Sequence, residues 1–226
     1  EKGEKDPDNK LLSRGARYRL AAESVRDETL AASGLLSPKI GGPSVKPYQP
    51  KGLWEAATSG RGVLATYRQD HKEDLYRRGM YTFIKLTVPR PGMVLFDASN
   101  RDQCEVRRSR TNTPLQALIM MNDPAVMEAS RVLAEKLANE SSSPTEKIEK
   151  AFRLIICRKP TAKEQNILSA YFTEQLESFK QKKNNAKATL DVGEYPPQQV
   201  ADINAAAALM KIINTIYNME EAITKS

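Results

Sequence analysis

The sequence predicts a mostly α-helical fold, an irregular helical array or bundle joined to a half that is rich in loops. Ten of the eleven glycines and seven of the thirteen prolines lie before residue 93. After them come helix-capping residues, each followed by apolar residues at helical spacing, without the alternation typical of strands. We therefore expect a disordered or linker-like start at 1–15 and a single helical domain over 16–226. Within that domain, 16–111 would form a loop-rich basic part and 112–226 a helical array.

The first expected helix covers residues 16–32 and ends at Gly34, because glycine suits the left-handed conformation of a helix C-cap. Residues 37–50 follow, and their four prolines and two glycines exclude regular structure. A short helix at 53–57 is expected to place Trp54, the single tryptophan, in the core. Long ordered loops such as 37–50 often carry function or wrap a neighbouring surface.

Residues 70–87 are expected to form a central helix, because their apolar side chains occupy more than one side of it. A strand at 82–88 is the alternative. Pro89 and Pro91 end the segment, and 93–96 is expected to be extended.

Caps mark four helix starts in the second half, and each cap stands just before an apolar helical repeat. The four capping residues are Thr113, Asp123, Ser143 and Thr161. The first three precede prolines, which suit the first helical position. A polar stretch at 180–197 then leads to a final helix at 203–217, whose alanines allow a neighbouring helix to approach closely.

Two residue counts exclude several chemistries. The chain has one histidine, His71, which excludes zinc fingers and most metalloprotease patterns. Its two cysteines, Cys104 and Cys157, form no CxxC motif, so thioredoxin-type redox chemistry and covalent haem attachment are excluded. A disulfide between them is possible, but two thiols are favoured. We expect neither a metal nor a cofactor in this chain.

The sequence shows no targeting signal that would assign the protein to a cellular compartment. No run of about 18 apolar residues is present, so a transmembrane helix is not expected. The polar, charged start is not a signal peptide and lacks an initiator methionine, so we expect the chain to be a piece of a longer protein.

The net charge of +7 is concentrated in the first half. Residues 1–113 carry 21 Lys and Arg against 14 Asp and Glu, whereas 114–226 carry 14 of each. The densest basic stretch precedes the helix start at Thr113, and its candidate anion-binding residues are Arg107, Arg108, Arg110, Thr111 and Asn112. Guanidinium groups and helix N-termini both bind anions. In the alternative, these arginines pair with Asp70, Asp74 or Asp97 and hold the loop-rich half together.

A second cluster offers weak acid/base candidates. They are Asp70, His71 and Asp74, joined by Asp97. A histidine flanked by carboxylates could serve as a general base, but no nucleophile motif accompanies it. A helix start capped by Asp70 explains the same residues. Nucleic-acid binding by Tyr–Arg pairs of the basic half is a further alternative that lacks a recognisable motif.

Several stretches resemble a known family over most of the chain. They are 22–27, 33–36, 41–50, 74–78, 81–83, 107–118 and 122–124. The sequence resembles the C-terminal part of the PSD-type domain of unknown function. That domain occurs in large multidomain proteins of planctomycetes and Bacteroidetes-type bacteria, often downstream of a planctomycete-type cytochrome c domain.

The resemblance implies an exported, extracytoplasmic parent protein (periplasmic or secreted), with haem c in an upstream domain, encoded near sulfatase-like and polysaccharide-handling proteins. It transfers no catalytic residue. We expect a non-catalytic binding or scaffolding module, with the arginine cluster and the 41–50 loop as its anion or inter-domain surface. Its partners would be upstream domains of the same polypeptide or an anionic glycan. The alternatives are an enzyme domain acting on anionic or sulfated glycans and, less favoured, a nucleic-acid binder.

Overall fold

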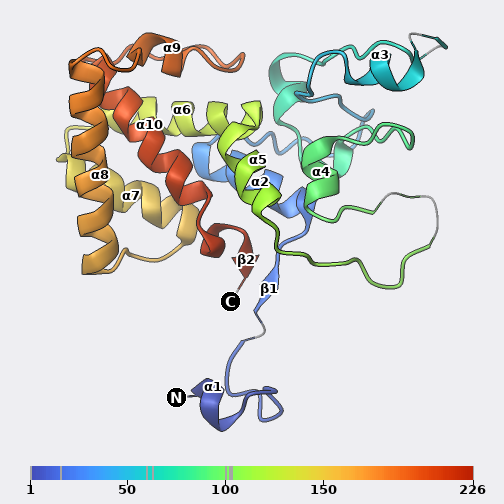
Figure 1. The fold of residues 1–226 in the computed structure, drawn as a ribbon, viewed down its shortest axis with the longest axis horizontal. Coiled ribbons are helices and arrows are strands. Elements are labelled where there is room, and N and C mark those ends of the chain that lie inside the picture. The colour runs from blue at the N-terminus through green and yellow to red at the C-terminus, as the bar shows by residue number, and fades with distance from the viewer. Residues whose placement is uncertain are drawn as a thin grey trace.

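A computed structural model describes residues 2–15, 17–59, 61–62, 64–99, 101 and 104–225. It is mostly α-helical, as the sequence predicts (Figure 1). The α-helices are α1 (Lys2–Lys5), α2 (Ala22–Ser33), α3 (Leu53–Thr58), α4 (Pro91–Leu95), α5 (Pro114–Asn122), α6 (Pro124–Ala138), α7 (Pro144–Ile156), α8 (Ala162–Lys180), α9 (Ala186–Leu190) and α10 (Ile203–Tyr217). Three 3-10 turns, η1 (Lys72–Tyr76), η2 (Gly79–Tyr81) and η3 (Glu220–Ala222), and two short strands, β1 (Tyr18–Arg19) and β2 (Thr224–Lys225), complete the described part.

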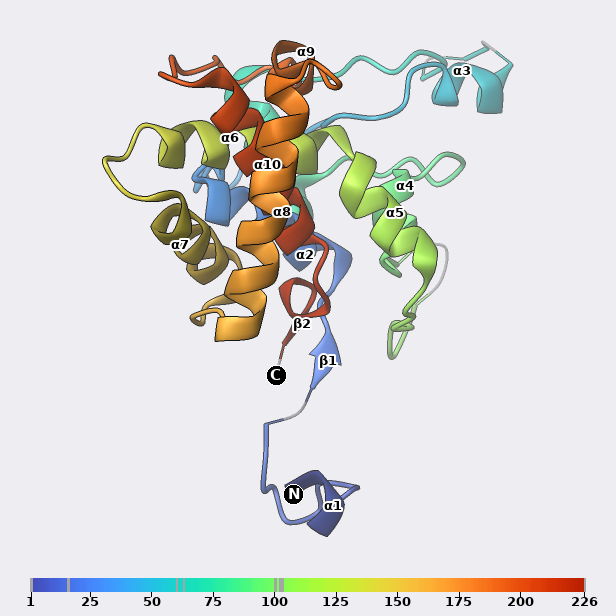
Figure 2. The same ribbon diagram turned by 60° about the vertical axis from the view of Figure 1, so that its left-hand side comes forward.

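Helix α10 is the centre of the helical half. It packs against α6, α7, α8 and α9, and the two views show these helices gathered around it (Figures 1 and 2). Its alanines 206–208 are fully buried, so small side chains allow the close approach that the sequence predicts. Helix α2 of the first half packs on α6 and joins the same apolar core.

The predicted helix starts are confirmed. The backbone N–H of Ser143 donates to Oε2 of Glu146 at 2.7 Å, and Thr161 and Glu164 make the same contact at 2.7 Å. Asp123 accepts from the backbone N–H of Ala125 at 2.8 Å. These contacts satisfy backbone groups that have no partner within a helix.

The first expected helix begins later than predicted. Its end at Gly34 is confirmed, where φ is 82°. Residues 18–19 form a strand instead, because β1 pairs antiparallel with β2, with Tyr18 opposite Lys225, and residue 16 lies outside the described residues. A local helical pattern cannot reveal a strand partner from the other end of the sequence.

The helix expected at 70–87 is wrong. Only the turns η1 and η2 form there, since Lys72 has a φ of 57° and Gly79 lies against the backbone of Glu23. A Cβ on Gly79 would stand 2.8 Å from Cα of Glu23, so glycine is required at this close approach. The alternative strand shrinks to one isolated bridge between Val45 and Thr82.

Two further local predictions need correction. Residues 91–95 form α4 rather than an extended segment, and Pro91 occupies the first helical position. Trp54 is buried in α3, but it packs on Tyr67 and Phe83 in a small cluster outside the main core. The ring centroids of Trp54 and Tyr67 lie 4.9 Å apart.

Buried arginines hold the loops of the first half. Arg77 is 1% exposed and donates to the carbonyl oxygens of Pro43 at 2.9 Å, Lys39 at 3.4 Å and Gly41. Nε of Arg90 donates to the carbonyl of Tyr48 at 3.2 Å. These donors satisfy loop carbonyls that accept no backbone hydrogen bond from the described residues.

Three remaining features concern the chain as a whole. Residues 2–15 form α1 and a turn closed by Asp6, which lie apart from the helical body in both views (Figures 1 and 2). Cys104 and Cys157 are free thiols, as favoured from the sequence, and both are exposed. None of the helices in the described ranges has the length and apolar character needed to cross a bilayer.

Candidate functional site

A groove of about 580 Å³ brings the predicted arginine cluster together with both strands. We call it the basic groove. It lies between the start of α2, the β1–β2 ribbon, the residues after α4 and the segment at 106–110. Its lining residues are Tyr18, Arg19, Leu20, Ala21, Ser24, Glu28, Phe96, Asp97, Val106, Arg107, Arg108, Ser109, Arg110 and Lys225.

Arg19 forms the buried part of the basic groove. Its side chain comes from β1, and the residue is 8% exposed. Nη2 donates to Oδ1 of Asn112 at 2.6 Å, while the buried Nη1 has no hydrogen-bond partner among the described residues. Burial lowers the pKa of Arg19, and the charges of Glu220 and Asp97 oppose that shift. The guanidinium adds positive charge to the wall of the groove, which favours an anionic ligand.

The three arginines of the predicted cluster have different roles. Arg108 is half-buried and pairs with Glu23 at 2.8 Å, so this member of the cluster does act structurally, through Glu23 rather than through Asp70, Asp74 or Asp97. Arg107 and Arg110 are exposed, and no ion pair joins them to other described residues. The guanidinium of Arg110 lies 4.9 Å from the ring centroid of Tyr18.

Thr111 and Asn112 support the groove instead of lining it. Asp97 accepts hydrogen bonds from the backbone N–H of Thr111 at 2.7 Å and from its hydroxyl at 2.9 Å. Gln116, which is buried, donates to the same hydroxyl at 3.2 Å. The oxygen of Asn112 is used by Arg19. These contacts fix the segment that carries Arg107 and Arg110.

The charge of the groove is positive. Arg19, Arg107, Arg110 and Lys225 face it without a carboxylate in direct contact, whereas Arg108 is paired. Its two carboxylates are Asp97 and Glu28. Burial raises the pKa of Glu28, and nearby Lys225 lowers it. The arrangement suits a bound anion.

The other acid/base candidates lie elsewhere. Asp70 accepts from the backbone N–H of Lys46 at 2.6 Å, which fixes the 41–50 loop. His71 is exposed and lies 2.9 Å from Glu194. Asp74 is half-buried in η1. Of the four candidates, Asp97 alone lines the basic groove.

Sequence reasoning missed two of the cationic residues of the groove, Arg19 and Lys225. Both lie on the β-ribbon, and their meeting depends on a pairing between the two ends of the sequence. No local motif marks such a pairing. Among the described residues, no cluster of three or more His, Cys, Asp or Glu side chains forms a possible metal site.

Comparison with known proteins places the chain in a family. A family model described as PSD1, protein of unknown function (DUF1553), matches residues 1–172. The chain belongs to the PSD1 family. Neither the curated proteins nor the solved structures gave a match. The PSD1 match ends within α8, so the central helix α10 lies beyond it.

Segments of the PSD1 match that are far apart in sequence meet around α2. Asp27 accepts from the backbone N–H of Gly79 at 2.6 Å and from Nε of Arg78 at 3.1 Å. Glu23 pairs with Arg108, as described above. Helix α2 therefore joins the 74–83 and 107–118 stretches and supports one wall of the basic groove.

Proposed function

We propose that this chain is a non-catalytic binding module whose basic groove takes an anionic ligand bearing carboxylate or sulfate groups. The observation that carries the proposal is the set of cations that line the groove without an ion pair to a described carboxylate, namely Arg19, Arg107, Arg110 and Lys225. Guanidinium groups bind carboxylate and sulfate oxygens through charge-assisted hydrogen bonds.

The shape of the groove supports a ligand larger than a single ion. Its volume of about 580 Å³ lies in the range of small-molecule sites. Tyr18 and Phe96 supply ring surfaces next to Arg110 and Arg19. Aromatic rings beside cationic side chains suit the apolar faces and charged substituents of an acidic sugar.

The non-catalytic part of the proposal rests on the carboxylates. Asp97 is held by two hydrogen bonds from Thr111, and Glu28 is partly buried at the groove wall. Nδ1 of His71 lies 2.9 Å from a carboxylate oxygen of Glu194, and His71 does not line the groove. We therefore assign the groove a binding role and no acid/base step.

The setting of the module is part of the same proposal. We propose that it acts outside the cytoplasm within a larger protein, with a haem c domain upstream and an anionic glycan as the ligand. The resemblance noted from the sequence supports this setting. Fractionation of cells that carry the full-length gene would test the location, and recovery in the cytoplasm would contradict it.

Thermal unfolding with defined ligands tests the binding proposal. The panel comprises a sulfated oligosaccharide, a uronic oligosaccharide, a neutral oligosaccharide and a short DNA duplex, each at low and moderate salt. We expect a saturable stabilisation by one acidic sugar, of about 2.7 kcal/mol at a hundred times its dissociation constant. The double variant Arg107→Gln/Arg110→Gln should lose most of this stabilisation.

Arg61→Gln/Arg68→Gln is the matched control, because it also removes two charges and both residues are exposed and do not line the groove. It should respond like the wild type. If the control lost as much of the ligand-induced stabilisation as the double variant, the effect would come from the net charge of the protein and not from the groove. Stabilisation by DNA alone, falling steeply with salt, would favour nucleic-acid binding instead. No stabilisation by any acidic sugar would contradict the proposal.

A further inference from the structure

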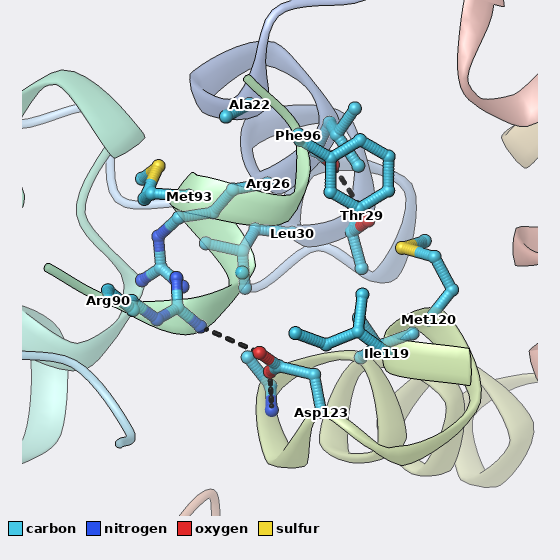
Figure 3. A pocket seen from close by; sticks show the side chains of 14 residues that line it. Ala22, Arg26, Thr29, Leu30, Arg90, Met93, Phe96, Ile119, Met120 and Asp123 are labelled. Carbon is cyan, nitrogen blue, oxygen red and sulfur yellow. Dashed lines mark hydrogen bonds and ion pairs between the residues drawn. The ribbon is translucent and has the colours of Figure 1, made fainter. Parts of the chain in front are cut away.

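A second, smaller cavity lies on the other side of α2, where α2 faces α4 and the junction of α5 with α6. Its volume is about 50 Å³. Its lining residues are Ala22, Val25, Arg26, Thr29, Leu30, Arg90, Gly92, Met93, Phe96, Ile119, Met120, Asp123, Ala125 and Val126 (Figure 3). Phe96 also lines the basic groove, but none of the groove's charged residues lines this cavity.

Arg26 is the unusual member of this cavity. It is 7% exposed, and its Nη2 donates to the backbone carbonyl of Leu75. Its Nε and Nη1 are buried without a hydrogen-bond partner in the described ranges. Burial lowers the pKa of Arg26 to about 9, and the neighbouring charge of Arg90 adds to the lowering. Two unused donors on a buried charge are a strong sign of a missing acceptor.

The nearby carboxylates of Asp123 and Asp27 partly offset the lowering of the pKa of Arg26, but neither forms a hydrogen bond or ion pair with its guanidinium. Asp123 pairs with Nη2 of Arg90 at 3.0 Å, and its other oxygen caps α6 through Ala125. Asp27, next along α2, is used by Arg78 and Gly79. The cavity therefore holds two guanidinium groups and one carboxylate. One positive charge remains without a counter-ion in a buried place, which is costly unless an anion is bound.

The rest of the wall is apolar. Figure 3 shows the guanidinium groups of Arg26 and Arg90 on one side, with Ile119, Met120 and Phe96 on the other. A separate groove of about 310 Å³ shares Arg90, Gly92, Ile119 and Asp123 with the cavity and continues beneath 48–50. The cavity has room for one small charged group, and the adjoining groove has room for a short apolar chain.

We propose that the Arg26–Arg90 cavity binds a monocarboxylate with a short apolar chain, its carboxylate lying on the side of the two guanidinium groups and its chain lying toward Gly92 and Ile119. A single negative charge balances the two arginines and Asp123. A guanidinium fork matches the two oxygens of a carboxylate. This site is independent of the basic groove and of the acidic sugar proposed there.

Titration with a homologous series tests the site. The probes are sodium acetate, butyrate and hexanoate, followed by thermal unfolding at constant ionic strength, with sodium chloride, inorganic phosphate and butyramide as comparisons. We expect saturable stabilisation that increases from acetate to hexanoate. Butyramide should give none, because it has the same shape as butyrate without the charge.

Two variants localise the effect. Gly92→Ala adds a Cβ at ordinary contact distances, 3.6 Å from Oδ2 of Asp123 and 3.7 Å from Cδ1 of Ile119, so it fills the cavity without touching either arginine. It should fold normally and weaken butyrate binding roughly tenfold or more, because the added methyl group takes the space of about one methylene of the ligand. Arg26→Met removes the donors and should abolish the response, with circular dichroism reporting whether it folds.

Val94→Ala is the matched control for Gly92→Ala, since Val94 lies in the same helix, is half-exposed and does not line this cavity. It should bind butyrate like the wild type, and so should Arg107→Gln/Arg110→Gln. Equal stabilisation by chloride or phosphate would mean a general salt effect and overturn the proposal. So would equal stabilisation by butyramide, unchanged binding in Gly92→Ala, or no response to any carboxylate.

Discussion

In α7 of the helical half, Ile148, Ala151 and Phe152 are fully buried on one apolar face. In the loop-rich half, one of the most deeply buried large side chains is Arg77, whose guanidinium holds three loop carbonyls. Helices satisfy their own backbone groups, so their side chains are free to form an apolar core. Loops at 37–50 cannot do so, and buried arginines supply the missing donors.

Because of this difference, arginine has two roles in the first half: some arginines donate to loop carbonyls, and others are exposed at the basic groove. Arg77 and Arg90 donate to backbone carbonyls of the loop at 37–50. Arg107 and Arg110 are exposed at the basic groove. The predictions below test the two modes of stabilisation and then the difference between the two sets of arginines.

The largest effect is expected from Phe152→Ala in the helical half. It deletes a fully buried aromatic ring and leaves a cavity, which should lower the free energy of unfolding by about 3–5 kcal/mol. Urea unfolding measures the change. Leu154→Ala, on the exposed side of the same helix, is the control and should cost far less. Similar losses in both variants would argue against the described core.

Arg77→Met should be the most damaging single change in the loop-rich half. It keeps the unbranched, apolar inner part of the side chain and removes its three hydrogen bonds to carbonyls, for an expected loss of about 3 kcal/mol. Hydrogen exchange should show lost protection near Val45 and Tyr81, whose backbones pair at 2.8 Å, while α10 stays protected. A variant as stable as the wild type would show that the loops do not need this donor.

Helix caps should matter less than the core. Ser143→Ala removes the acceptor for the backbone N–H of Glu146, at an expected cost of about 1 kcal/mol. Ser141→Ala, two residues earlier and exposed, is the control. Thermal unfolding compares the two. If the control were as damaging as Ser143→Ala, the capping assignment would be wrong.

The smallest effect concerns pH. Hydrogen bonds from Arg158 lower the pKa of Glu164 to about 2, below its ordinary value of 4.5. The pair therefore stabilises the fold above pH 4.5, and this contribution is lost as pH falls through about 2. Because both side chains remain in contact with solvent, at 35% and 25% exposure, water screens the pair and we expect about 0.5 kcal/mol. Glu164→Gln should flatten this part of the stability–pH profile, and an unchanged profile would count against the pair.

Much of the helical half could be predicted from its sequence, because its signals are local. The capping residues Asp123, Ser143 and Thr161 act within three positions, and the apolar face of α7 repeats every helical turn. The alanines of α10 likewise mark a close approach without revealing which helix approaches.

The loop-rich half could not be predicted in the same way, because its structure depends on distant partners. The expected helix at 70–87 is replaced by turns, since Gly79 packs on Glu23 and Arg77 reaches the loop at 39–43. At the candidate site, the sequence predicted Arg107 and Arg110 but not Arg19 or Lys225. Those two reach the groove only through the β1–β2 pairing.

We propose that Arg77 stabilises the fold whereas Arg107 and Arg110 serve a ligand. Urea unfolding of Arg107→Gln/Arg110→Gln without any ligand tests it most directly, with Arg77→Met measured in parallel. We predict that the double variant keeps its free energy of unfolding within about 1 kcal/mol of the wild type, as exposed substitutions usually do. A loss as large as that of Arg77→Met would show that the groove arginines hold the fold together, and it would remove the basis for the proposed binding site.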